Sequence, residues 1–462
     1  MEKFSFIDIP GALRGRGAGL AARDRHVENM MHTVTRNLVL GLAVVAFSAV
    51  AEESSVGQQS APQTSQSGYE RIAEFGGPDG VSEQLKQADE QRESLFKWGT
   101  PGRWLEPWYD WKARIKEENG VALGFFFSFL GQTASDTTDG DDSALGGIYR
   151  FNGSWTVLNN GGANPGRIEW RVEARSDIGN NQAPQSLGSA IGTTALNSGF
   201  GYSERFKTDI SVLNWTQGFR DSTTGIALGR LAFDVYMDAF AFQTFSGGFL
   251  NRGFLLNPTI GTTGIGALGA VAKGMVTDQF WVGAQIYDGN AASGEFDWDT
   301  VQENEYLKAL EIGWTPAFDR RKLSKIQFTY WDKDARSIAG VPSGHGWAVS
   351  ASWELNDHWL PFVRFGDSNG GAGVAAEKAV SGGFQYTVRP DQKLVLGVGW
   401  AKPSRKTNGS GLDDEFVIET SYNLQLAKNF SLLPDLQLVL DPASNPDKSR
   451  VWVVGFRAIA TF

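Results

Sequence analysis

The chain ends with the stretch VWVVGFRAIATF, residues 451–462, and this stretch decides the fold class. In an extended strand, successive side chains point to opposite faces. One face is then wholly apolar from Trp452 to Phe462, whereas the other face includes Arg457. Most domains carry a polar, frayed tail instead. A final strand with an unbroken apolar face therefore needs an apolar surrounding along its whole length.

The same alternation with period two runs through the sequence from Val121 onward. The clearest examples, each with one apolar and one polar face, are residues 168–175, 347–355, 394–400 and 415–426. The polar faces mix charges of both signs with glycine and serine, and the apolar faces carry Trp, Tyr and Phe towards their ends. This pattern is typical of a transmembrane β-barrel, in which apolar side chains face lipid and polar side chains face a wet lumen.

A barrel also closes its own edges, which a membrane requires because unpaired backbone groups find no water there. About 340 residues, at roughly 20 to 22 per strand and connection, give about 16 strands. The predicted fold is therefore all-β: a transmembrane antiparallel β-barrel of about 16 strands over residues 121–462, with short helices before it. An aromatic final residue, Phe462, is typical of outer-membrane proteins and predicts contact with the outer-membrane assembly machinery.

The first 78 residues contain a targeting segment. Residues 30–51 hold a basic residue, an apolar run and Ala49-Val50-Ala51, which is the pattern of a secretory signal peptide. A membrane helix needs about 20 apolar residues, and this run is shorter. Residues 1–29 form a doubtful upstream extension, with the true start at Met30 or Met31. Residues 52–78 lack periodicity and predict a flexible linker.

Residues 79–120 predict a helical periplasmic segment. Its first part carries a heptad-like apolar stripe through Val81, Leu85 and Ala88, which favours a docked surface helix over a coiled coil. A second helix is predicted to end at Gly120, which suits a helix C-cap.

Composition excludes several functions. The chain has no Cys, which excludes disulfides, thiol catalysis and thiolate metal sites. A net charge of -10 argues against nucleic acid as a partner. The acidic stretch at residues 136–142 misses the spacing of an EF-hand loop, and only four His occur in the chain. We therefore predict neither a metal site nor a cofactor.

Residues 415–462 contain a motif that consists of Glu419, Tyr422, Pro434-Asp435-Leu436-Gln437, Pro442, Gly455-Phe456-Arg457 and Phe462. This motif resembles the C-terminus of the OprB family, the carbohydrate-selective porins. Looser similarity lies in residues 228–254 and in Asp288-Gly289-Asn290. The resemblance implies an outer-membrane protein of a Gram-negative bacterium. It also implies passive uptake of glucose and related sugars through an eyelet lined by arginines and acids.

Such an eyelet would act on sugars through side chains on opposing walls that donate to and accept from hydroxyl groups. Strand parity, less certain for Arg230, Glu311 and Arg364, places ten charged candidates in the lumen: Glu169, Arg171, Glu173, Arg175, Arg230, Glu311, Glu354, Arg364, Glu419 and Arg457. A wall charge in any porin can also serve only to keep the lumen solvated, and that alternative stays open for each residue.

Two other functions remain open. A general porin, or one for anions or organic acids, would also be a barrel, although an anion pore should carry an excess of Lys and Arg on its lumen faces. An outer-membrane barrel enzyme would need a histidine, for which His345 and His358 are the mature candidates. No GxSxG or HExxH motif supports an enzyme, so we predict none. The predicted partners are outer-membrane lipid and small sugars, and the choice between a monomer and a homotrimer stays open.

Overall fold

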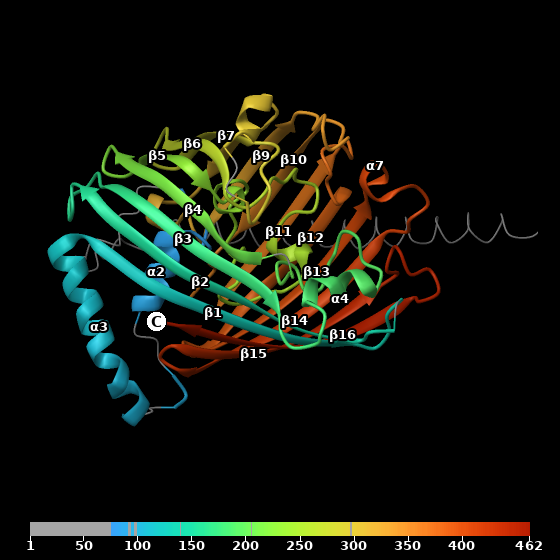
Figure 1. Ribbon diagram of the computed structural model, residues 1–462, viewed down its shortest axis with the longest axis horizontal. Helices are drawn as coiled ribbons and strands as arrows, with labels where there is room; N and C mark the ends of the chain where they lie inside the picture. Colours follow the sequence, from blue (N-terminus) through green and yellow to red (C-terminus); the bar gives the residue numbers. More distant parts are fainter. Residues whose placement is uncertain (1–74, 91–93, 97–98, 139, 205, 296–297) are drawn as a thin grey trace, which may run out of the picture. The chain divides into compact units, whose positions relative to one another are not determined.

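The computed structural model describes residues 75–462, except residues 91–93, 97–98, 139, 205 and 296–297. The predicted segments 1–29 and 30–51, and the linker up to residue 74, lie outside the described residues. The described chain forms a closed barrel of sixteen antiparallel strands, which confirms the predicted fold class (Figure 1). The strands are β1 Val121–Ala134, β2 Ser143–Leu158, β3 Gly166–Asp177, β4 Phe206–Phe219, β5 Thr224–Leu231, β6 Ala267–Met275, β7 Phe280–Asp288, β8 Tyr306–Trp314, β9 Lys325–Lys333, β10 Gly344–Ser352, β11 Trp359–Ser368, β12 Ala376–Arg389, β13 Gln392–Pro403, β14 Glu415–Ala427, β15 Phe430–Leu440 and β16 Arg450–Thr461.

The last strand closes the barrel against the first. β1 and β16 pair from Phe126 opposite Thr461 to Ala134 opposite Val453. The backbone of Phe462 continues the ladder, because its amide donates to Phe125 O at 3.0 Å and its carbonyl accepts from Phe125 N at 2.9 Å.

The alternating faces of β16 lie as the sequence predicts. Trp452, Val454 and Phe456 point outward with 43%, 50% and 53% of their surface exposed. Val453 and Arg457, on the other face, are buried inside the barrel. In an outer-membrane barrel the outward row meets lipid, so its exposure to the surroundings stabilises the protein in a bilayer.

Placing a charge in the outward row should destabilise the barrel in a depth-dependent way. We expect Val454→Arg, in the middle of β16, to lower the free energy of unfolding in lipid vesicles by about 2–4 kcal/mol. Phe219→Arg, at the end of β4, is the control and should cost about 0–1 kcal/mol for the charge. Urea titration followed by tryptophan fluorescence measures both values. Equal losses at the two positions would contradict the assignment of the outer face.

The two ends of the barrel differ in their connections. One end, which we call the turn end, carries the short connections, such as residues 390–391 and 428–429, together with Phe462. The other end, the loop end, carries the longer ones, which include residues 178–205 and residues 232–266. Outer-membrane barrels place short turns in the periplasm and long loops outside the cell.

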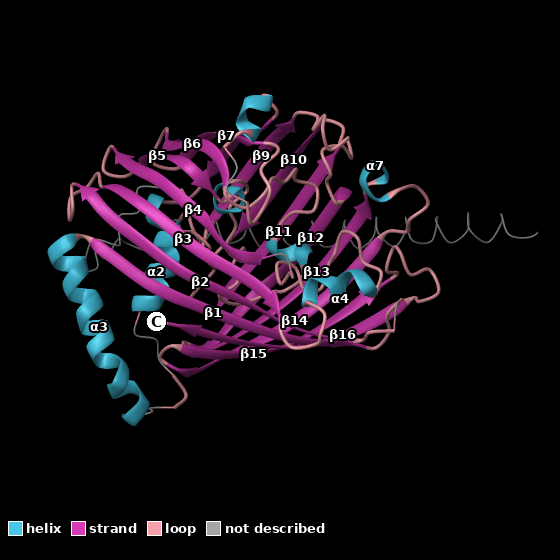
Figure 2. Ribbon diagram, viewed as in Figure 1, coloured by secondary structure: helices cyan, strands magenta, loops and turns pink. Residues whose placement is uncertain are grey.

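Short helices interrupt the connections. The loop of residues 178–205, called the first inner loop, contains α4 Pro184–Ala190. The loop of residues 232–266, called the second inner loop, contains α5 Phe233–Tyr236 and α6 Arg252–Leu255. The remaining short helices are α7 Arg405–Asn408, η2 Thr300–Glu303 and η3 Phe318–Arg320. Figure 2 shows α4 and parts of both inner loops within the outline of the strands rather than above their ends.

Among the described residues, two helices precede the barrel, within the predicted helical segment. α3, Gly99–Asn119, lies outside β1 at the turn end, where Trp108 packs on Phe125 with ring centroids 5.9 Å apart. It ends as predicted at Gly120, whose φ of +68° favours glycine. Among the described helices, none has the length and hydropathy to cross a membrane.

The other helix, α2, Val81–Asp89, lies within the barrel (Figure 1). The apolar stripe of its sequence predicts a docked surface helix, and the structure differs in where the helix docks. Its apolar stripe meets the inner side of β1 instead: a Cβ on Gly124 would lie 3.5 Å from Ala88 Cβ. A stripe of this length shows that a helix docks but does not show on which side of a sheet.

Candidate functional site

The second inner loop fills part of the lumen with an aromatic cluster. Phe240, Phe242, Phe249 and Phe254 from the loop surround Phe362 of β11, with ring centroids 4.9 to 6.3 Å from it. All five rings are buried. Such a cluster holds the loop by burial of apolar surface inside the barrel.

Glycines in the barrel wall let this loop approach closely. A Cβ on Gly397 of β13 would lie 2.7 Å from the Phe254 ring, closer than any real Cβ contact. The loop therefore rests directly on the backbone of β13. An alanine at this position would push the aromatic cluster away from the wall.

Buried charges of the wall bind the same loop from several strands. Glu419 of β14 accepts hydrogen bonds from Leu250 N at 2.5 Å and Asn251 N at 3.0 Å. Arg457 of β16 donates to Gly248 O at 2.7 Å. Asp238, in the loop, pairs with Arg364 of β11 at 2.5 Å. These contacts fix the loop across the lumen, so it narrows the channel.

The opposite wall holds Asp238 as well. Glu311 of β8 accepts a hydrogen bond from Asp238 N at 2.7 Å and forms an ion pair with Lys273 of β6. Gln327 of β9 donates to the Asp238 carboxylate at 2.9 Å. Asp238 has a left-handed φ of +52°, which is costly for a residue other than glycine. The surrounding hydrogen bonds hold this conformation.

One carboxylate of the wall accepts four hydrogen bonds from the first inner loop. Glu415 of β14 accepts hydrogen bonds from Thr194 N at 2.5 Å, Ala195 N at 3.0 Å and Leu196 N at 2.8 Å. It also accepts from the Thr194 hydroxyl at 3.0 Å. Successive backbone amides converge on one buried acid, so the loop has a fixed position at the loop-end side of the lumen.

α2 and Asp79, two residues before it, are held by the first strands of the barrel. Asp79 pairs with Arg150 of β2 at 2.8 Å and with Arg171 of β3 at 3.6 Å. Ser82 donates to Glu169 of β3. These side chains are buried, so their charges satisfy one another inside the barrel wall.

An open cavity of about 590 Å³ remains between α2, the second inner loop and the strands at the turn end. We call it the vestibule. Its described lining includes Phe75, Phe240, Phe242 and Trp281, together with polar side chains from β9, β12, β13 and β14. The cavity lies in the range of sites that accept small organic ligands.

The charges on the vestibule wall are balanced. Among its described lining residues, six are basic and six are acidic: Lys86, Lys273, Arg321, Lys322, Lys325 and Lys393 against Glu83, Glu90, Asp319, Glu354, Asp357 and Asp391. Several pair directly, as Lys322 does with Glu83. Burial lowers the pKa of Arg321, in a turn, to about 10, which leaves it charged at neutral pH.

Nine of the ten predicted lumen residues face the interior from within strands, and Glu354 lies two residues after the end of β10. Glu169 and Arg171 contact α2 or Asp79, and Glu173 bridges Arg150 and Arg175 at 2.5 and 2.6 Å. Arg175 also donates to Gly201 O of the first inner loop at 2.7 Å. Their charges therefore serve to hold inner segments, and their part in the constriction stays a prediction.

Most of the remaining predicted residues also hold an inner segment or pair with another side chain. Glu311, Arg364, Glu419 and Arg457 hold the second inner loop, as described above. Arg230 of β5 pairs with Asp209 of β4 at 2.9 Å. Glu354 differs from the other nine because it is half-buried and lines the vestibule.

Sequence reasoning missed the partners of these charges. Asp79, Arg150, Asp238 and Lys273 are each buried in an ion pair. Glu415 was placed on the polar face of its strand but not among the candidates. An acidic residue on the inner face of a strand was the available signal for Glu415. No signal connected Asp79 or Asp238 to the wall, because both lie outside strands.

The two histidines considered for an enzyme lie at opposite ends of the barrel. His345 is near the loop-end start of β10, with Asn369 as neighbour. His358 lies in the connection 353–358 at the turn end, where its ring contacts Thr387 O at 2.6 Å. Among the described residues, no group of three or more His, Asp or Glu is arranged to hold a metal ion.

Comparison with known proteins agrees with this geometry. Porin AaxA of Chlamydia abortus is 25% identical over 317 residues, which covers 66% of this chain and 68% of that protein. Porin AaxA of Chlamydia felis is 25% identical over 337 residues, covering 66% and 69%. The high-pH structure of Pseudomonas putida OprB superposes with a TM-score of 0.62 at 13% identity, covering 80% of this chain and 99% of that one.

That structural likeness shows the shared barrel fold. The family comes from the sequence itself, since the model for the carbohydrate-selective porin, OprB family, matches residues 176–462. The matched region includes β4 to β16, both inner loops, and Glu415 with Glu419. The chain is an outer-membrane porin, a channel and not an enzyme, and it belongs to the OprB family of carbohydrate-selective porins.

Proposed function

We propose that the porin serves passive, carbohydrate-selective diffusion, with glucose and related small sugars as permeants. The observation that carries the proposal is the balanced charge of the vestibule, where basic and acidic side chains stand in equal number among the described lining residues. An anion pore needs an excess of positive charge on its walls. A wall with charges of both signs offers hydrogen-bond donors and acceptors to the hydroxyls of a neutral solute, and it does not attract one type of ion over the other.

The inner loops support the same function. They are fixed by buried charges and so present a narrow lumen of constant shape, as at Glu419 and Asp238. Binding in a channel must remain weak enough for release, so many modest hydrogen bonds suit the task better than one tight site. Sugars are recognised by such contacts.

The test is single-channel recording of residues 52–462 in a planar bilayer, with glucose, maltose and sucrose added stepwise. We expect a saturable block of the ion current by at least one sugar. We also expect a reversal potential near zero under a potassium chloride gradient, because the wall charge is balanced. A current indifferent to all three sugars would reduce the function to general diffusion. A strongly anion-selective reversal potential would favour an anion or organic-acid porin.

A further inference from the structure

We propose that α2 is a permanent wall of the vestibule, and that its polar face forms a sugar-binding site separate from the constriction. The proposal rests on the proposed function, since it assigns a second site for the same permeants. The site consists of Glu83, Lys86, Gln87 and Glu90, together with the facing turn-end residues Asp391 and Lys393.

The spacing of residues on α2 divides it into two faces. Val81, Leu85 and Ala88 are buried and follow one face of the helix. Glu83, Lys86, Gln87 and Glu90 stand three, four and seven positions apart, which places them on a common face. All four line the vestibule. The helix therefore turns its apolar side to β1 and its polar side to the open channel.

The side of α2 that faces the barrel wall, together with Asp79, is too strongly bound for α2 to be a removable plug. Asp79 is buried between Arg150 and Arg171, and removal of α2 would strip both guanidinium groups of this partner. Glu169 would lose its hydrogen bond from Ser82. Leaving a buried charge without its partner is strongly unfavourable.

Further contacts hold α2 to the second inner loop and to the turn end. Gln84 donates to Ser246 Oγ at 2.7 Å, and Gly77 N donates to Val235 O at 2.7 Å. Lys322, in the connection between β8 and β9, pairs with Glu83 on the polar face. α2 is thus joined to both sides of the vestibule, which suits a fixed wall.

The chemistry of the polar face matches a neutral polyhydroxy ligand. Lys86 and Gln87 supply donors, and Glu90 and Gln87 supply acceptors. Asp391 and Lys393 repeat the same mixture on the barrel side of the cavity. A solute with hydroxyls around a ring can bind donors and acceptors on both sides. A small ion meets no net charge, because Lys322 pairs with Glu83 and the other four charges cancel.

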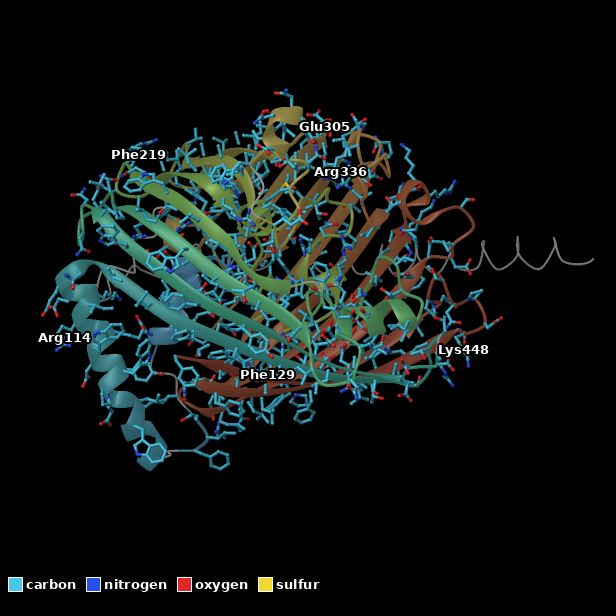
Figure 3. All side chains as sticks on the ribbon, in the orientation of Figure 1. Arg114, Phe129, Phe219, Glu305, Arg336 and Lys448 are labelled. Atoms are coloured by element: carbon cyan, nitrogen blue, oxygen red, sulfur yellow. The ribbon has the colours of Figure 1, made fainter. Side chains whose placement is uncertain are left out.

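The first experiment removes single contacts from the polar face. We expect Lys86→Gln and Glu90→Gln each to weaken sugar block by about three- to tenfold. Arg114→Gln and Glu118→Gln are matched controls on α3, outside the barrel, where Figure 3 shows Arg114. Unchanged block in both α2 variants would overturn the binding site.

A second measurement separates this proposal from the proposed function. Lys86→Glu changes the wall charge by two units, so it should raise the cation-to-anion permeability ratio by about twofold or more, whether or not sugars block. If no sugar blocks the wild-type channel, the proposed function and the binding site both fail. The permeability ratio then still tests whether α2 is a wall of the vestibule. A ratio equal to that of the wild type would show that α2 does not line the ion path. It would overturn the proposal that α2 is a wall of the vestibule.

A disulfide tests whether α2 is permanent. The chain has no Cys, and a Cβ at position 124 would lie 3.5 Å from Ala88 Cβ, which fits disulfide geometry. We expect the double variant Ala88→Cys and Gly124→Cys to oxidise and to conduct equally when oxidised and reduced. A larger conductance after reduction would identify a removable plug and overturn the proposal. Failure to cross-link would show that α2 does not dock on β1 and would overturn it too.

Discussion

Replacing Arg364 by methionine is expected to lower the free energy of unfolding by about 3–5 kcal/mol. Arg364 and Asp238 form an ion pair at 2.5 Å in which the two side chains are 1% and 0% exposed. The variant leaves Asp238 buried with its charge and without this partner. The second inner loop should also become less well held, so the single-channel current should grow and fluctuate more.

The control for Arg364→Met is Lys308→Met. Lys308 and Asp334 pair at 3.0 Å, but their side chains are 45% and 34% exposed. An exposed pair contributes about 0–1 kcal/mol, so the control should change stability by no more. Adding Asp238→Asn to Arg364→Met should recover part of the loss, since no buried charge then remains unpaired. Urea unfolding in lipid vesicles measures all three, and equal losses in Arg364→Met and Lys308→Met would contradict the expectation.

Glu415→Ala is expected to release the first inner loop from the wall. The variant removes the acceptor of four hydrogen bonds, three of them from the backbone of Thr194, Ala195 and Leu196. Each buried donor left without a partner costs about 1–3 kcal/mol, so we expect a loss of at least about 4 kcal/mol if the loop stays buried. If the loop instead leaves the lumen, protease should cut it in intact vesicles.

Two substitutions calibrate that result. Glu415→Gln keeps one acceptor oxygen and should fall between the wild type and Glu415→Ala. Asp413→Ala, at an exposed position two residues before Glu415, should leave both stability and proteolysis unchanged. The assignment of Glu415 as an anchor would be wrong if all three variants resisted protease as the wild type does.

The barrel itself could be predicted from the sequence because its signal is local. On β16 the alternation from Trp452 to Phe462 predicts which side chains face outward, and this pattern depends only on neighbouring residues. Gly120 likewise marks the end of α3 through a local conformational need. Each of these features depends on residues within one element, so periodicity and turn chemistry reveal them.

The contents of the lumen could not be predicted in this way. Asp238 and Arg364 are 126 positions apart, and Glu419 and Leu250 are 169 apart. A charged side chain on the polar face of a strand looks the same whether it meets water, a sugar or a loop. The ten candidates were therefore chosen by parity alone, and the structure supplies the partners that parity does not contain. Their role towards permeants stays a prediction.

The position of α2 has a consequence for the order of assembly. Its contacts with Gly124, Arg150, Glu169 and Arg171 all lie in β1 to β3, the strands that follow it directly in the sequence. The seam between β1 and β16 instead joins residues from opposite ends of the chain. Because short loops close at a lower entropic cost, α2 can dock on an early three-strand sheet before the seam forms. The growing sheet would then fold around α2, with Arg150 and Arg171 already neutralised by Asp79 just before the helix.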